Sequence, residues 1–322
     1  MILTLTANPS VDRTVTLAGP LQRGAVLRAA SMTSQAGGKG VNISRAAVAA
    51  GISTVAVLPA DDADPFVAEL RAAGIECRPL PPAGDVRVNL TLTEPDGTTT
   101  KVNSPGAAVD RVHLERLADA VVGLAAEATW VVLAGSLPPG APAEWYAELV
   151  VRLRGTAARV AVDTSEAPLA ALAAALPGAA PDLMKPNGEE LATIVGADPV
   201  ALEGDPAAAA RAAGVLVGRG VGAVLVTLGA AGGVLVTADG AWHAPAPPTT
   251  VLSTVGAGDS SLFGYLLASE RRLPPADALA LAVAYGSAAA GLPGTGIPRP
   301  GDVDAAAVSA TDLSPEAPAP TT

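Results

Sequence analysis

The 322-residue sequence predicts an α/β protein: a mostly parallel central sheet with helices on both faces, plus a small β-sheet lid. Between about residues 110 and 236, helical stretches alternate with short apolar runs, which is typical of βαβ units. Two other segments, about 11–34 and 85–105, interrupt this pattern and predict the small sheet. The runs expected to form parallel strands are 130–135, 159–163, 181–187 and 222–229.

The amino-terminal stretch MILTLTANPSVDRTVTL alternates like a strand and lacks the basic start and long apolar run of a signal peptide. We therefore expect a cytoplasmic chain. Within 85–105, the run VRVNLTLTEPDGTTTKVN is typical of a hairpin with PDG as its turn. Each later strand run ends in Gly, Asp or Asn, and ligands of open α/β sheets bind beyond the carboxyl ends of the strands.

The organisation along the chain indicates one domain over residues 1–302, with the two lid segments as an excursion from it. Residues 303–322 are rich in Pro, Ala and Ser, so we expect a flexible tail there. The single cysteine, Cys77, excludes an internal disulfide framework and a cysteine-rich metal site. Its apolar surroundings favour a buried thiol without chemistry.

The net charge of −11 argues against broad contact with nucleic acid or an anionic membrane surface, since both need a positive face. No uncharged apolar run reaches the roughly 18 residues of a membrane span. Of 20 basic residues only three are lysines, Lys39, Lys101 and Lys185, and all lie in motif-like stretches. Such lysines are candidates for point charges at phosphates. The two histidines, His113 and His243, lie outside these stretches, so a histidine base is not expected.

The stretch TVGAGDS combines two glycines and a carboxylate at the start of an expected helix. Backbone N–H groups and the helix dipole there favour an anion such as a developing phosphoryl charge. Asp259 would lie close enough to take a proton from an attacking hydroxyl, while Gly256 and Gly258 leave the approach open. The alternative interpretation of this stretch is an aspartate that only stabilises a helix start.

A second glycine cluster, AGGKGVN, also leads into a helix and contains Gly38, Lys39 and Asn42. It lacks the spacing of a Walker A loop, and GAAGG further on does not match the dinucleotide fingerprint. In MKPNGEEL, Asn187 and Glu190 are three residues apart at a helix start, where both could face a water-bound Mg²⁺. A capped helix with acidic residues in its first turn is the alternative interpretation.

Together GGKGVN, GSLPPG, KPNGEEL, VTLGAAGG and TVGAGDS resemble the ribokinase-like sugar kinases of the PfkB family, in order and over nearly the whole chain. The resemblance implies a ribokinase-like fold and ATP-dependent phosphoryl transfer. The opening TLTANPSVDRTV, the GGKG form of the glycine cluster, RVN and TKVNSPG are most similar to members that act on fructose 1-phosphate. One departure is DTSE at 163–166, where many relatives have DTSG, and no role is assigned to Asp163.

The resemblance also implies roles for individual residues. Asp259 would be the catalytic base, and the N–H groups of Ala257, Gly258 and Asp259 would form the anion hole. Asn187 and Glu190 would face Mg²⁺ through water. Residues implied to bind the sugar phosphate are Asp12, Gly38, Lys39, Asn42, Arg87, Lys101 and Arg28. Residues implied to bind ATP are Lys185, Asn187, Thr227, Gly229, Gly232 and, on the helix 282–290 beside the adenine, Ser287.

The expected reaction is transfer of the ATP γ-phosphoryl group to the 6-hydroxyl of fructose 1-phosphate, giving fructose 1,6-bisphosphate. Fructose 6-phosphate or tagatose 6-phosphate as acceptor remains an alternative within the family. A sugar-phosphate-binding regulator without turnover is an alternative of another class, and the basic residues argue against a nucleoside or ribose kinase. An exposed sheet edge on the lid predicts a homodimer.

Overall fold

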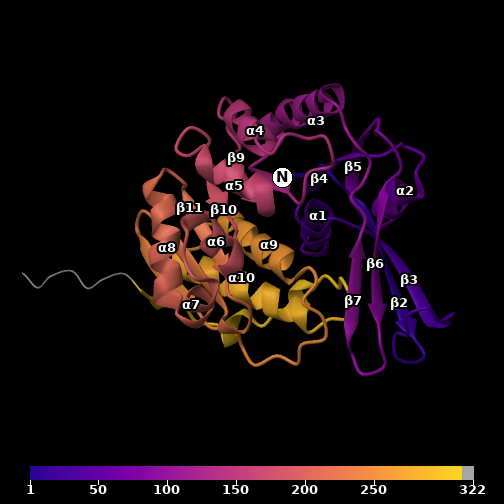
Figure 1. Cartoon of the computed structure of the whole chain (residues 1–322). Helices are drawn as coiled ribbons and strands as arrows, with labels where there is room; N and C mark the ends of the chain where they lie inside the picture. Colours follow the sequence, from indigo (N-terminus) through magenta and orange to yellow (C-terminus); the bar gives the residue numbers. More distant parts are fainter. Residues whose placement is uncertain (314–322) are drawn as a thin grey trace, which may run out of the picture.

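The computed structural model describes residues 1–313, which form a large sheet, two helical layers and a smaller sheet (Figure 1). The seven strands from β11 to β5 in the large sheet run parallel, while β12, β13 and β14 add antiparallel strands at one edge. This confirms the predicted mostly parallel sheet. In spatial order its strands are β14 (Thr311–Asp312), β13 (Gly240–Ala244), β12 (Gly233–Thr237), β11 (Ala223–Thr227), β10 (Leu183–Met184), β9 (Arg159–Asp163), β8 (Trp130–Ala134), β1 (Ile2–Thr6), β4 (Thr54–Pro59) and β5 (Glu76–Leu80).

Helices cover both faces of this sheet because its strands are apolar on both sides. In β1, Ile2 packs into the core cluster on one face, whereas Leu3 and Leu5 pack into the cluster on the other. The first face is covered by α1 (Lys39–Ala49), α2 (Pro65–Ala72), α9 (Ala257–Glu270) and α10 (Pro275–Ala290). The opposite face is covered by α3 (Arg111–Leu124), α4 (Trp145–Leu153), α5 (Glu166–Ala174), α6 (Gly188–Val195), α7 (Pro199–Gly204) and α8 (Pro206–Gly218).

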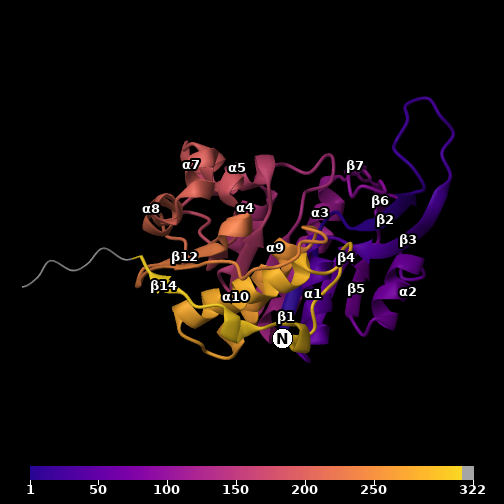
Figure 2. The ribbon, with the colours of Figure 1, turned by 90° about the horizontal axis from the view of Figure 1, so that it is seen from below.

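The smaller sheet is the predicted lid. Its strands, in spatial order, are β3 (Ala29–Gly37), β2 (Ser10–Leu17), β6 (Arg87–Thr93) and β7 (Thr99–Asn103). The β6–β7 hairpin turns at the predicted PDG, where the Gly97 N–H donates to the Glu94 carbonyl. The loop between β2 and β3, residues 18–28, projects from the body of the molecule (Figure 2).

The lid is not antiparallel throughout, because its central pair, β2 and β6, is parallel. β2 follows β1 and β6 follows β5, and these two strands of the large sheet run in the same direction. The chain therefore enters the lid twice from the same side. Sequence alternation alone does not report this shared direction.

The carboxyl-terminal segment differs from the expected flexible tail over residues 303–313. Val308 is buried in the core, and Thr311 and Asp312 pair with β13 as strand β14. An apolar side chain and an open sheet edge hold a segment whose composition predicts fraying. The rest of the predicted tail lies outside the described residues.

Short 3₁₀ helices cover Ala125–Glu127, Gly229–Ala231, Pro300–Asp302 and Ala305–Ala307. In residues 1–313, every helix is too short or too polar to cross a lipid bilayer.

Candidate active site

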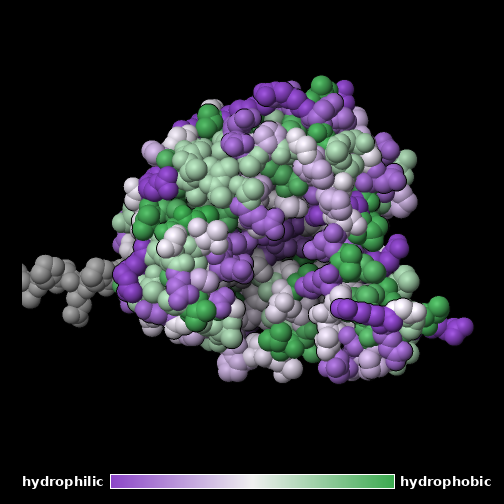
Figure 3. All heavy atoms as spheres, in the orientation of Figure 1, coloured by the Kyte–Doolittle hydropathy of each residue, from purple (hydrophilic) through white to green (hydrophobic). Residues whose placement is uncertain are grey.

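A polar cavity of about 920 Å³ lies where the carboxyl ends of the large sheet's strands face the lid. Figure 3 shows the corresponding hollow, with hydrophilic side chains gathered in it. Most of the predicted sugar-binding and catalytic residues line this cavity: Asp12, Gly38, Lys39, Asn42, Arg87, Gly256, Gly258 and Asp259. Strand ends from distant parts of the chain meet here, as parallel sheets require.

Asp259 lies in the first turn of α9 and is 7% exposed. Gly256 precedes the helix with φ of 80°, a backbone conformation that favours glycine. Within residues 1–313, the N–H groups of Gly258 and Asp259 have no backbone acceptor, and the Ala257 N–H makes only a long contact of 3.4 Å with the Thr254 carbonyl. The helix start therefore presents amide donors beside a carboxylate.

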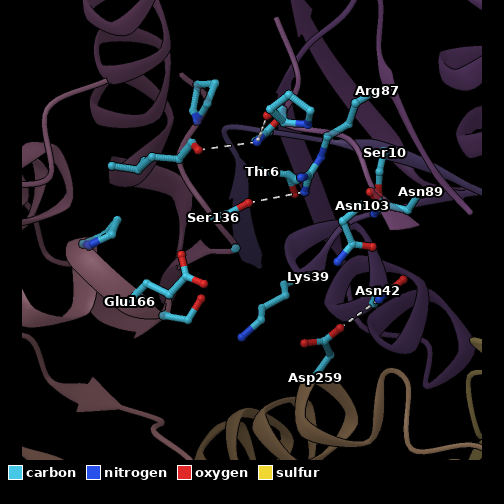
Figure 4. A pocket seen from close by; sticks show the side chains of 18 of the residues that line it. Thr6, Ser10, Lys39, Asn42, Arg87, Asn89, Asn103, Ser136, Glu166 and Asp259 are labelled. Atoms are coloured by element: carbon cyan, nitrogen blue, oxygen red, sulfur yellow. Dashed lines mark hydrogen bonds between the residues drawn. The ribbon is translucent and has the colours of Figure 1, made fainter. Parts of the chain in front are cut away.

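The Asp259 carboxylate is held by one neighbour from α1. Asn42 Nδ2 donates to Asp259 Oδ2 at 2.8 Å, and the two side chains point toward one another in Figure 4. Burial raises the pKa of Asp259 to about 6, against the opposing charge of Lys39. A carboxylate with this pKa is ionised at neutral pH and is a stronger base than an exposed aspartate.

A buried ion-pair cluster joins the two lysines of the cavity. Lys39 Nζ lies 2.6 Å from Asp163 Oδ1, and Lys185 Nζ lies 3.2 Å from Asp163 Oδ2. Asp163 is fully buried; burial opposes its ionisation, yet the charges of Lys185 and Lys39 hold its pKa below the usual value. Burial alone would lower the pKa of Lys39, but the carboxylates of Asp163 and Asp259 raise it. The ammonium group of Lys39 is thus kept charged at the cavity, and Lys185 pairs with the same carboxylate.

Asp163 was assigned no role from the sequence. Its signal was nevertheless present, since it is the acid that ends strand β9 at the carboxyl edge of the sheet.

The lid contributes a second polar cluster. Asp12 Oδ1 accepts from Ser10 Oγ at 2.8 Å and from Asn89 Nδ2 at 3.1 Å. Across the cavity mouth, Arg87 donates to the Ser104 carbonyl at 3.0 Å and to Ser136 Oγ at 3.3 Å.

Within the described residues, the buried Arg87 Nε and Asn89 Oδ1 atoms have no hydrogen-bond partner. Buried polar atoms of this kind are costly unless a ligand or water satisfies them. Ser10, Asn89 and Ser136 line the cavity but were not predicted as site residues, although each stands in a stretch that carries the family resemblance: TLTANPSVDRTV, RVN and GSLPPG.

A second cavity, of about 750 Å³, adjoins the first, and both are lined by Asn187, Thr227 and Gly258. Several of the residues predicted to bind the nucleotide line it. Gly232 has φ of 90°, and a side chain there would collide with the Ala244 carbonyl. The predicted residues on its wall are Asn187, Thr227, Gly229, Gly232, Ala257, Gly258 and Ser287. Lys185 lines the first cavity instead.

Asn187 and Glu190 form a capping box at the start of α6. Asn187 Oδ1 accepts from the Glu190 N–H at 2.7 Å, and Glu190 Oε2 accepts from the Asn187 N–H at 2.9 Å. The helix-cap interpretation of this pair is therefore realised, while both residues also line the first cavity. Among residues 1–313, no three His, Cys, Asp or Glu side chains gather as a metal cluster.

Two predicted phosphate ligands lie outside both cavities. Arg28 is exposed at the end of the projecting loop, and Lys101 is exposed on edge strand β7. Glu166, from the DTSE departure, lines the first cavity with φ of 53° (Figure 4). A left-handed conformation is uncommon for a residue other than glycine.

Sequence comparison finds close relatives of the whole chain. It is 39% identical over 305 residues to the 1-phosphofructokinase of Rhodobacter capsulatus, covering 93% of each chain. It is also 39% identical over 265 residues to the 1-phosphofructokinase of Xanthomonas campestris pv. campestris, covering 81% of this chain and 82% of the relative.

Structural comparison agrees. Phosphofructokinase-2 from Escherichia coli, in complex with substrates and products, matches with a TM-score of 0.85 and 30% identity over 94% of this chain and 96% of that one. Ribokinase from Thermotoga maritima shares the fold alone, with a TM-score of 0.71 and 20% identity over 94% of this chain and 97% of that one. The pfkB family carbohydrate kinase model matches residues 5–301. The motif resemblance and the ribokinase-like fold are thereby confirmed, and the chain belongs to the pfkB family of carbohydrate kinases.

Proposed function

We propose that the chain transfers the γ-phosphoryl group of ATP to the 6-hydroxyl of fructose 1-phosphate, with fructose 1,6-bisphosphate and ADP as products. The observation that carries this proposal is the position of Asp259 on the wall of the first cavity, next to Gly258, which lines both cavities and whose N–H has no backbone acceptor among residues 1–313. An acceptor would occupy the polar cavity and the nucleotide the second one. The 1-phosphofructokinases among the relatives support this choice of acceptor.

In the proposed mechanism, Asp259 accepts the proton of the acceptor hydroxyl as its oxygen bonds to the γ-phosphorus. The bond from that phosphorus to the β–γ bridging oxygen breaks, and ADP leaves with the electron pair. The N–H groups of Ala257, Gly258 and Asp259 stabilise the charge on the transferring group. Lys39 and Lys185, both paired with Asp163, add positive charge nearby. Catalysis on this scheme is mainly positioning and electrostatics.

The acceptor would be held between the lid and the large sheet. Asp12 and Asn42 would bind sugar hydroxyls, and Arg87 would bind the phosphate already present, where its Nε lacks a partner. Gly38 leaves room for the ligand against the backbone. Lys101 and Arg28 would contribute only if the lid moved or a neighbouring subunit approached, and Lys101→Ala tests this by the KM for the acceptor.

Mg²⁺ would lie beside Asn187, which lines both cavities, and Glu190, which lines the first, because side-chain oxygens are the ligands that it prefers. The amide oxygen of Asn187 and one carboxylate oxygen of Glu190 already accept hydrogen bonds in the capping box. The two side chains would therefore contact the ion through water. The ion would neutralise phosphate charge on the bound nucleotide. Titration of Mg²⁺ with the wild type and Glu190→Gln would test the assignment: a weaker apparent affinity is expected in the variant, and an unchanged one would remove Glu190 from the site.

The acceptor is tested by initial rates with fructose 1-phosphate, fructose 6-phosphate and tagatose 6-phosphate at fixed Mg-ATP. A clear preference for either 6-phosphate would overturn the assignment in favour of the alternative within the family. Binding without turnover of any of the three would favour the regulator instead. In fructose 1-phosphate the phosphate is on carbon 1 and the reactive hydroxyl on carbon 6, whereas the two 6-phosphates have the reverse arrangement. The initial rates therefore distinguish the two kinds of acceptor directly.

We further propose a homodimer through the lid. Alternate residues of the lid strands point away from the cavity, and most of them are apolar, although Arg13 and Ser34 share this face. Met32 is 58% exposed and Val102 is 55% exposed on this face. Other outward residues are Val15, Leu90 and Leu92. Light scattering tests this: Leu90→Asp should convert dimer to monomer, and a monomeric wild type would refute the proposal. A cytoplasmic location stays a prediction from the sequence.

A further inference from the structure

Among the described residues, one side-chain hydrogen bond joins the cavity face of the lid to the loop after α10. Thr295 Oγ1 donates to Gln35 Oε1 at 2.7 Å, and the two residues are 260 positions apart. Both side chains are half-buried. None of the predicted site residues takes part in this contact, and the mechanism above does not use it.

At the lid end, the hydrogen bond is made by a residue of β3, the strand that pairs with the strand of Asp12. Gln35 in β3 is paired with Asp12 in β2, and cross-strand partners project from the same face of a sheet. Asp12 lines the polar cavity, so Gln35 lies on the cavity side of the lid as well. Two residues further on, Gly37 passes so close to the Asp12 carboxylate that a side chain there would collide with it. A displacement of β3 therefore displaces Asp12.

At the other end, Thr295 belongs to a tight turn continuous with the wall of the second cavity. The Gly296 N–H donates to the Pro293 carbonyl at 3.2 Å, which closes the turn. Five residues before Thr295, Ala290 lines the second cavity.

The Ala290 carbonyl accepts from the N–H groups of Leu252 at 2.9 Å and Ser253 at 3.2 Å. That segment leads directly to Gly256 and the start of α9. Ala290 on the wall of the second cavity is thus linked through the chain to the turn that holds Gln35, and through hydrogen bonds to the segment that leads to Gly256.

We propose that Gln35 and Thr295 are positioning residues that couple the two cavities. A nucleotide in the second cavity restricts the motion of this wall. Through the Thr295–Gln35 hydrogen bond, the motion of lid strand β3 is restricted as well, and β3 positions Asp12 over the acceptor. The inference rests on the proposed function, in which nucleotide and acceptor occupy these cavities. One neutral hydrogen bond corresponds to about a fivefold change in an equilibrium constant. Coupling of this kind is reciprocal, so the acceptor tightens nucleotide binding by the same factor.

The test is the Kd of fructose 1-phosphate, measured by calorimetry with and without a non-hydrolysable ATP analogue. In the wild type the analogue should tighten acceptor binding at least about fivefold. Thr295→Val keeps the shape and removes the hydroxyl, so the tightening should fall about fivefold, and Thr295→Ser should restore it. In steady state, Thr295→Val should raise the acceptor KM about fivefold and leave kcat within about twofold.

Ser34→Ala is the matched control. Ser34 Oγ accepts from Arg13 Nε at 3.2 Å, a bond that lies within the lid and does not reach the α10 loop. Gln35→Met breaks the proposed coupling from the other side, should Thr295→Val fail to fold. The inference is overturned if the wild type shows no tightening, if Thr295→Val and Gln35→Met keep it, or if Ser34→Ala loses it equally. Wild-type turnover with fructose 1-phosphate, measured separately, reports on the proposed function alone.

Discussion

Removal of the hydrogen bond between Asn42 and Asp259 should move the acid limb of the pH–rate profile to higher pH. Asp259 must be ionised to accept a proton, so kcat/KM should fall as the pH drops through its pKa of about 6. The Asn42 donor stabilises the ionised form, because it donates to the carboxylate at 2.8 Å in a buried setting. Without that donor the neutral acid is favoured, and the pKa rises.

The size of the shift follows from the strength of such a bond. A hydrogen bond to a charged group contributes about 1.5–3 kcal/mol, and one pKa unit corresponds to about 1.36 kcal/mol. Asn42→Leu should therefore raise the pKa of Asp259 by about one to two units, and the acid limb should move from near pH 6 to about pH 7–8.

The assay is ADP release between about pH 5 and 9, with kcat/KM for ATP measured at saturating acceptor so that weaker sugar binding does not mask the limb. Ser44→Ala on the same helix is the control, since the Ser44 hydroxyl bonds Thr4 and Thr54 at 2.9 Å. Its limb should stay in place. A lower rate in Asn42→Leu with an unmoved limb would refute the assignment of Asp259 as the titrating base.

Three further outcomes are expected. Asp259→Asn should lower turnover by about 10³-fold while calorimetry still shows nucleotide binding, and full activity would exclude the residue as base. Asp163→Leu should reduce the free energy of unfolding, measured by urea titration, by about 3–5 kcal/mol, because Lys185 and the partly exposed Lys39 lose their shared carboxylate. A loss below about 1 kcal/mol would contradict the ion-pair account. Glu166→Gly should raise the melting temperature, since the φ of 53° costs a side-chain-bearing residue about 1 kcal/mol; a fall would show that the Glu166 side chain itself stabilises the fold.

Local patterns were sufficient for much of this protein. The βαβ alternation predicted the sheet, and the glycines before Asp259 predicted a helix start with free amides, because both features depend on residues close in sequence. The alternation predicted strand existence better than strand length: the run 181–187 forms only Leu183–Met184, since it ends at a loop that leads into the α6 cap. Motif order also identified the family, since each glycine-rich stretch has its own spacing.

Contacts between distant segments were decided by the tertiary structure alone. Lys39 and Asp163 are 124 residues apart in sequence. Only the order of the strands in the large sheet brings Lys39, at the start of α1, next to the carboxylate of Asp163 at the end of β9. Three other features also depend on how distant segments are arranged. β2 and β6 run parallel, and Lys101 lies outside both cavities. Thr311 pairs with the open edge of strand β13. Sequence periodicity records which face of an element is apolar. It does not record which elements become neighbours, because that depends on how all of the buried faces are covered at once.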